Sequence, residues 1–158
     1  MYRPDKLILQ TKTAYNICLI VCLAVFVIIS PRPVSADPVV IHHPSLINED
    51  YSRDSLVRIY AMQKKIWFDG TPVKVFILPK DSNTHKEFVV KYLKMQPYQL
   101  SRLWHRFLFS GTGSIPNEIT SVTEMVNTIK KTPGAIGYID SRFIDQVNEA
   151  MIGGSSNE

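Results

Sequence analysis

The sequence predicts an α/β domain, and two patterns support this expectation. Segments with the 3.6-residue apolar period of helices alternate with short runs rich in β-branched residues, an order typical of a sheet with helices packed against it. The short runs carry few charges, so their strands are expected to be buried on both faces. We therefore expect one lobe with a small, mostly parallel or mixed sheet flanked by helices.

The N-terminal segment, residues 1–36, resembles an export signal. Basic residues precede an apolar run over 17–29, whose about 13 residues match a signal-peptide core and fall short of the roughly 20 that span a membrane. Residues 34–36, Val-Ser-Ala, are small enough to precede a cleavage site. Cleavage is expected between Ala36 and Asp37, which would place the protein in the periplasm and limit its membrane contact to the uncleaved signal. The alternative is that the segment stays attached as an anchor.

Removing the leader changes the charge and the cysteine content. The whole chain carries 18 basic and 14 acidic residues, of which 4 and 1 lie within residues 1–36, so the mature chain has a net charge of only +1. Nucleic-acid binding, which needs a concentrated basic surface, is not expected. Both cysteines, Cys18 and Cys22, leave with the leader. The remaining 122 residues must form one domain without disulfides, and this length suffices for a core.

The elements of the mature chain follow from its turn and capping signals. Ser52 is expected to cap a helix, and the Asp-Gly turn after Trp67 precedes a strand. Ser121 and Glu124 have the spacing of a capping box. The expected strands cover residues 38–44, 73–78 and 135–139. Four helices are expected: one after Ser52, one over 85–95, one that starts at Pro97 and one after Ser121. A short extended piece precedes Ser121, and a short helix is compatible with 141–151.

The core and the domain limits complete this assignment. The aromatic residues Trp67, Trp104, Phe107 and Phe109 are expected in the core, because the last three have helical spacing. The domain is expected to cover residues 37–145, with a tail over 146–158.

Two polar segments are candidate anion sites. The first, Ser82, Asn83 and Thr84, leads into a helix, whose free N–H groups and dipole favour an anion. The second segment contains Ser110, Gly111 and Thr112, whose glycine and hydroxyls suit a backbone nest. Ligands of open α/β sheets bind beyond the carboxyl ends of the strands. We therefore expect both segments to meet at that edge and to bind the ligand together.

Catalysis and metal binding have little support in the sequence. His42 and His43 are neighbours on a strand and point to opposite faces, and no carboxylate or cysteine lies at ligand spacing from His85 or His105. No nucleophile elbow surrounds Ser82 or Ser114, so a serine hydrolase ranks last among the alternatives. We expect no enzyme activity, no cofactor and no metal site.

Three motifs resemble the phosphate-binding proteins of bacterial ABC transporters. Residues 56–70 resemble the family's LxxIFxGKxxxWxDG region, and residues 132–139 match its TPGAIGYV segment. Residues 104–113 resemble the WxxxxFTGxG run of the short, single-lobe members. The resemblance covers residues 39–140 and implies a PstS-like domain, that is, one lobe of a type II periplasmic-binding-protein-like fold.

The resemblance also implies a function. It implies an exported, non-enzymatic protein that binds phosphate or a similar small oxyanion, with the membrane components of an ABC transporter as partners. In the family, a Ser-Gly-x-Thr loop and an upstream arginine hold the oxyanion; here Ser82 and Thr84 match, Asn83 replaces the glycine and Lys80 is the nearest cation. Lysine lacks the bidentate fork of arginine, so weak binding is expected. The alternative is an interaction or sensory module for an envelope partner that has lost ligand binding.

Overall fold

The computed structural model describes residues 37–111, 114–147 and 151–153. The expected signal segment, Thr112 and most of the expected tail lie outside the described residues. Ser35–Glu158 forms a compact unit of its own. In the described part of the chain, no helix combines the length and the apolar character that a membrane crossing requires.

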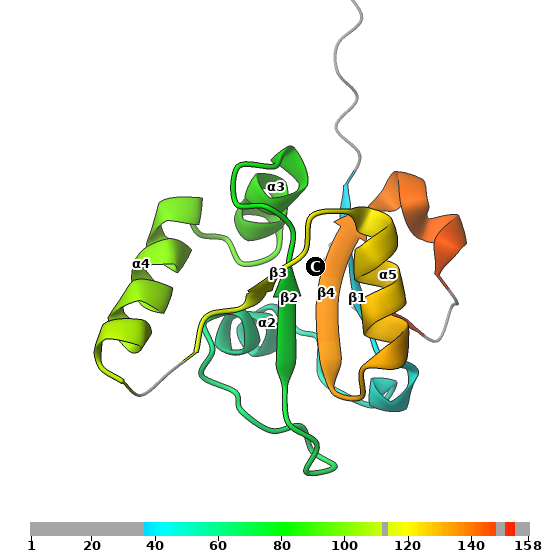
Figure 1. Ribbon diagram of the computed structural model, residues 1–158, viewed down its shortest axis with the longest axis horizontal. Coiled ribbons are helices and arrows are strands. Elements are labelled where there is room, and N and C mark those ends of the chain that lie inside the picture. The colour runs from blue at the N-terminus through cyan, green and yellow to red at the C-terminus, as the bar shows by residue number, and fades with distance from the viewer. Residues whose placement is uncertain (1–36, 112–113, 148–150, 154–158) are drawn as a thin grey trace, which may run out of the picture. The chain divides into compact units, whose positions relative to one another are not determined.

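The described strands form a five-stranded mixed sheet in the order β3-β2-β4-β1-β5 (Figure 1). The strands are β1 (Pro38–His42), β2 (Lys74–Ile77), β3 (Asn117–Glu118), β4 (Ala135–Asp140) and β5 (Ile152–Gly153). β2 pairs in parallel with β3 and β4, whereas β1 pairs antiparallel with β4 and β5. All six residues of β4 are buried, as expected for a strand in the middle of the sheet. The expected α/β class with a mixed sheet is confirmed.

Helices cover both faces of this sheet. The helices are α2 (Arg53–Tyr60), α3 (Asn83–Lys91), α4 (Pro97–Phe109) and α5 (Val122–Lys131), with 3-10 turns at η1 (Pro44–Leu46) and η2 (Ser141–Gln146). Neighbouring residues of β4 point to opposite faces. On one face, a Cβ added at Gly137 would lie 2.7 Å from Sδ of Met125 in α5. On the other, the ring of Tyr138 stacks on Phe88 of α3 and lies beside Tyr60 of α2.

A braced hairpin over residues 66–72 precedes β2. Trp67 is buried and its Nε1 donates to the carbonyl of Gly134, 2.9 Å away. The carboxylate of Glu49 accepts a hydrogen bond from the Phe68 N–H and pairs with Lys64. The ring of Phe68 itself is 98% exposed. The turn expected from the Asp-Gly signal is therefore present, and it leaves one aromatic side chain in solvent.

Two expectations about packing are corrected by the structure. Trp67 and Trp104 are in the core, but Phe107 is only half buried and Phe109 is 86% exposed. The reason is that α4 is anchored through one side only, by Leu100 and Trp104. Helical spacing predicts which residues share a face, but it does not predict how much of that face the domain covers.

The C-terminal limit of the domain also differs from the expectation. Ile152 and Gly153 form β5 beside β1, and Met151 is buried, so the sheet extends past residue 145. A two-residue strand is too short to show a period, and the sequence pattern gave no sign of it.

The expected cap of α5 forms in part. The Ser121 side chain accepts the Glu124 N–H, whereas the Glu124 carboxylate is hydrogen-bonded by Thr120, which is half of the expected capping box.

Candidate anion site

The N-terminus of α3 is capped and still has unused donors. Ser82 has extended backbone angles, and its Oγ accepts the His85 N–H at 3.2 Å. Its carbonyl accepts the Lys86 N–H at 3.2 Å. Within the described residues, the N–H groups of Asn83 and Thr84 have no hydrogen-bond partner. Free N–H groups in the first turn, together with the positive end of the helix dipole, are what an anion requires.

A buried histidine in this first turn is hydrogen-bonded to the central strand of the sheet. His85 is in the core, and its Nδ1 lies 2.5 Å from the hydroxyl of Tyr138 in β4. The same hydroxyl oxygen accepts the N–H of Leu78 at 3.1 Å. One of the two groups, Nδ1 or the hydroxyl, donates a proton to the other, and the tautomer of the ring decides which. Nε2 is buried without a partner in the described chain.

The charges around the site come from lysines and from the helix end. Burial, followed by the nearby charges of Lys80 and Lys86, lowers the pKa of His85 to about 4, so its ring is neutral at pH 7. Lys80 is exposed, and its Nζ lies 5.7 Å from the ring centroid of Trp104. Asp81, also exposed, is next to Lys80. A carboxylate beside an anion site favours an oxyanion that still carries a proton, since it can accept that proton.

The second candidate segment lies at the other end of α4. Ser110 is the C-cap of the helix, and its N–H donates to the Arg106 carbonyl at 3.1 Å. The Gly111 N–H donates to the Leu108 carbonyl at 3.2 Å. Gly111 has a left-handed backbone conformation, with φ 69°. These donors terminate the helix, and the helix dipole is negative at this end, which disfavours an anion.

The structure therefore does not bring the two segments together. In Figure 1, α3 begins beside the carboxyl end of β2, whereas the C-terminal end of α4 points away from α3. Ser82, Asn83 and Thr84 lie together at the start of α3, whereas Ser110 and Gly111 follow the end of α4. Thr112 lies outside the described residues.

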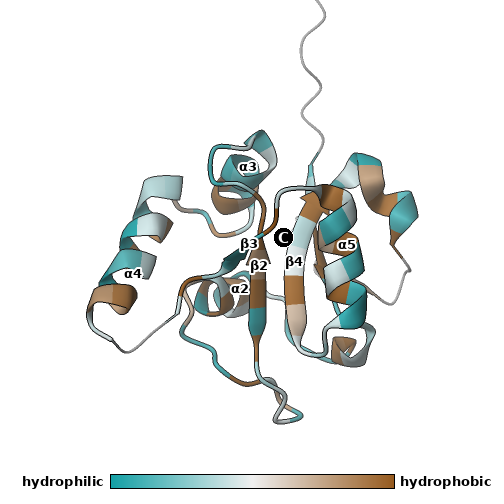
Figure 2. Ribbon diagram, in the orientation of Figure 1, coloured by the Kyte–Doolittle hydropathy of each residue, from teal (hydrophilic) through white to brown (hydrophobic). Residues whose placement is uncertain are grey.

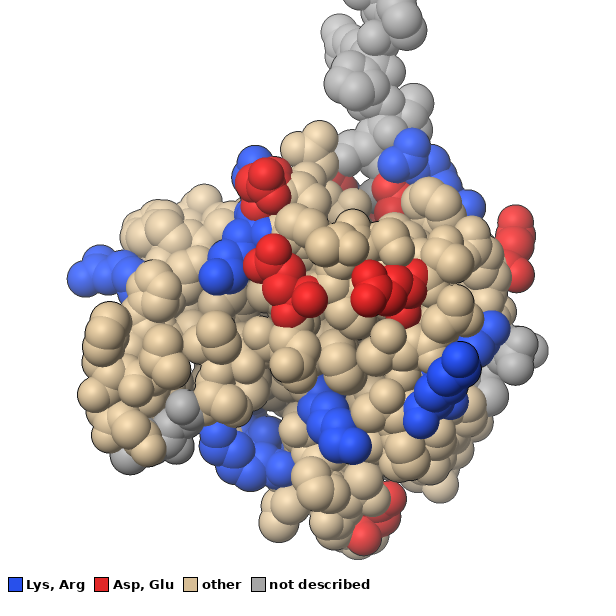
Figure 3. Space-filling view, viewed as in Figure 1, with Lys and Arg blue, Asp and Glu red and all other residues tan. Residues whose placement is uncertain are grey.

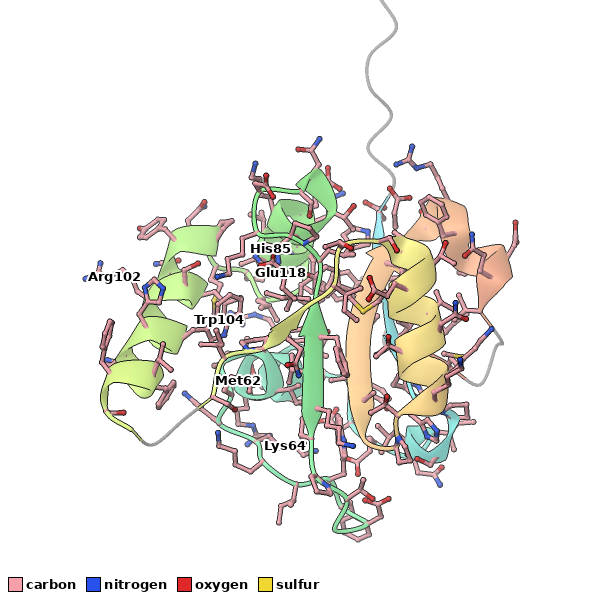
Figure 4. All side chains as sticks on the ribbon, in the orientation of Figure 1. Met62, Lys64, His85, Arg102, Trp104 and Glu118 are labelled. Carbon is pink, nitrogen blue, oxygen red and sulfur yellow. The ribbon has the colours of Figure 1, made fainter. Side chains whose placement is uncertain are left out.

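Residues that sequence reasoning missed surround the site. His85 has no local sequence signal of a role, because its partner, Tyr138, is distant in the sequence and only the fold places the two together. Glu118 of β3 lies close enough to Tyr138 to add to burial in raising the pKa of that hydroxyl. Figure 4 shows His85 and Glu118 at this end of the sheet and Trp104 between α4 and the sheet. The described residues contain no group of three side chains placed to hold a metal ion.

The fold has solved relatives. The chain is similar to an ABC-type phosphate transport receptor from Vibrio cholerae, with a TM-score of 0.53 and 13% identity over 73% of this chain and 44% of the receptor. The chain has a PstS-like fold. It is also similar to PstS from Borrelia burgdorferi, with a TM-score of 0.49 and 13% identity over 70% of this chain and 43% of that protein. No protein-family profile and no curated protein sequence matches the chain.

The PstS-like fold confirms the resemblance inferred from the three motifs. The chain spans less than half the length of either receptor. In this PstS-like fold, the start of α3 follows β2 directly, at the edge where open α/β sheets place their ligands.

Proposed function

We propose that this chain is an exported, non-enzymatic solute-binding protein that weakly binds phosphate or a similar small oxyanion at the N-terminus of α3. The observation that carries the proposal is the pair of unused N–H groups of Asn83 and Thr84 in the first turn of a capped helix. The hydroxyls of Ser82 and Thr84 and the ammonium group of Lys80 are the further donors. The proposed place of action is the periplasm, and the proposed partners are the membrane components of an ABC transporter.

The composition of the site supports weak binding. One helix end supplies a few hydrogen bonds, whereas an oxyanion that leaves water must recover most of its hydration. Asp81 and Glu118 are exposed carboxylates near this end of the sheet, and their charges oppose a dianion. Asp81 also favours phosphate over sulfate, because only phosphate retains a proton near neutral pH.

The runner-up is an envelope interaction module that has lost ligand binding. The separation of Ser110 and Gly111 from the α3 site favours it, since half of the expected donors do not contribute. It predicts a stable domain that no oxyanion stabilises.

Thermal unfolding of the purified domain tests the proposal. Phosphate should raise the melting temperature in a saturable way, and at about ten times the dissociation constant mass action adds ~1.4 kcal/mol to the unfolding free energy. Sulfate at equal ionic strength is the control and should have a smaller effect. An unchanged melting temperature at millimolar phosphate would reject the binding function and favour the interaction module.

A further inference from the structure

The outer side of α4 carries apolar side chains that the described residues do not cover. The helix is fixed to the domain through Leu100 and Trp104, and Trp104 Nε1 donates to the Tyr60 carbonyl at 2.7 Å. At the C-terminal end of the helix, Leu108 is 48% exposed and Phe109 is 86% exposed. Figure 2 shows the C-terminal end of α4 as strongly hydrophobic. Clustered exposed apolar side chains on a helix end indicate a binding surface.

The same side of α4 is basic. Arg102 and Arg106 are exposed and form no ion pair within the described chain. The sequence contains no aspartate or glutamate between Glu87 and Glu118. Figure 4 places Arg102 on the side of α4 that is turned away from the sheet. On the face drawn in Figure 3, the charged residue over the outer part of α4 is basic.

A shallow hollow lies between the two arginines. Its volume is about 490 Å³, and it is lined by Gln99, Arg102, Leu103, His105 and Arg106. Guanidinium groups bind phosphate oxygens in a bidentate manner, so the hollow suits a phosphate headgroup. Tyr98, which is 60% exposed, lies at the start of the helix, and Phe109 lies at its end.

We propose that the outer side of α4 is a docking surface for a membrane that contains anionic lipids. Helices that combine Arg with Phe, Leu and Tyr bind at the membrane interface, where apolar side chains enter the headgroup region and cations contact phosphates. The unpaired arginines complement an anionic surface, and this complementarity selects it over a neutral bilayer. The lipid surface is fluid, so Leu108 and Phe109 at the helix end can enter it without a preformed pocket. This docking is independent of the oxyanion site on α3.

Vesicle co-sedimentation tests the docking surface. The probe is the leader-free domain, residues 37–158, which contains every described core residue and lies within one compact unit. It is mixed with vesicles of equal parts phosphatidylcholine and phosphatidylglycerol, and with vesicles of phosphatidylcholine alone. We expect binding to the anionic vesicles, weakened at about 1 M salt, where the Debye length falls to ~3 Å.

Matched variants assign the binding to α4. The double variant Leu108→Ser/Phe109→Ser should weaken binding about tenfold or more, since it removes the apolar contacts. Each of Arg102→Gln and Arg106→Gln should weaken it about fivefold. The control is Phe68→Ser, which removes a similarly exposed ring from the hairpin and should bind like the wild type. Circular dichroism melting shows that each variant is folded.

Hydrogen exchange of the full-length chain provides a second readout. In vesicles with phosphatidylglycerol, amides of residues 98–109 should exchange more slowly than in neutral vesicles, and the hairpin over 66–72 should not change. Three results would each overturn the proposal. The protein could bind both vesicle types equally, Phe68→Ser could weaken binding as much as the α4 variants do, or the exchange rate of the α4 amides could be the same with both lipids. Binding to an acidic protein, without any binding to lipid, would also overturn it, in favour of a protein partner.

Discussion

The Nδ1 atom of His85 lies 2.5 Å from the Tyr138 hydroxyl, which joins the first turn of α3 to the central strand β4. Both side chains are buried. The hydroxyl also receives the N–H of Leu78, the residue that follows β2. One oxygen atom thus fixes the end of β2, the start of α3 and the middle of β4 relative to one another. The position of the proposed anion site depends on this connection.

The variant Tyr138→Phe should destabilise the fold. It leaves the buried Leu78 N–H and Nδ1 of His85 without a protein partner, and each unsatisfied buried group costs about 1–3 kcal/mol. Urea unfolding should show the loss as a lower midpoint with an unchanged slope. The control is Tyr98→Phe on the exposed side of α4, which should leave the midpoint unchanged. Equal midpoints for Tyr138→Phe and wild type would contradict the role assigned to this hydroxyl.

Stability should fall as the solution becomes acidic. The pKa of His85 is about 4 in the folded protein, because of burial, against about 6.5 in the unfolded chain. Between these values the unfolded chain binds a proton that the folded protein does not, so each pH unit removes up to about 1.4 kcal/mol. His42 acts in the same direction, since burial lowers its pKa.

Urea unfolding between pH 7 and pH 5 checks this dependence. The variant His85→Gln should unfold with a flatter pH profile, whatever its stability at neutral pH. A profile as steep as that of the wild type would show that His85 does not titrate on unfolding.

Two glycines with similar backbone angles should respond differently to alanine. Gly70 and Gly134 have φ values of 83° and 79°. A Cβ at Gly70 would meet nothing within 4 Å, whereas one at Gly134 would lie 2.2 Å from the Pro72 carbonyl oxygen. Gly70→Ala should therefore cost about 1–2 kcal/mol, from backbone strain alone. Gly134→Ala should cost roughly 3–5 kcal/mol because overpacking is added. Equal unfolding free energies of the two variants would contradict the close contact.

Proline at the first position of α3 should remove a phosphate donor without breaking the helix. Asn83 is the first helical residue, and Ser82 before it has φ −64° and ψ 145°, which a following proline tolerates. Asn83→Pro should keep the melting temperature of the free protein and weaken phosphate binding about tenfold or more. The control is Val122→Pro, at the same position of α5 after Ser121. If both variants bind phosphate as the wild type does, the anion does not contact the start of α3.

Local signals predicted the elements that short segments determine. Ser52 and Ser121 each cap a helix, and Pro97 begins α4. In each case the residue type acts on its own backbone or on that of the next three residues. Such effects are present in any chain that contains the residue.

The remaining differences depend on packing between distant segments. The loop after α4 has the composition of an anion nest, but the N–H groups of Ser110 and Gly111 close the helix, and only its geometry shows this. The exposure of Phe109 depends on how far α4 stands from the sheet, and β5 exists only because β1 offers a free edge. The role of His85 in positioning α3 depends on its hydrogen bond with Tyr138, which is 53 residues away in the sequence.

The position of β1 also bears on how the protein reaches its final state. β1 is the first strand to be synthesised, yet its neighbours on both sides, β4 and β5, lie after residue 134. Pairing between segments so far apart in sequence slows folding. A nascent chain therefore cannot complete its central sheet until nearly all of it has left the ribosome, and a truncation before Ala135 leaves β1 with no strand to join.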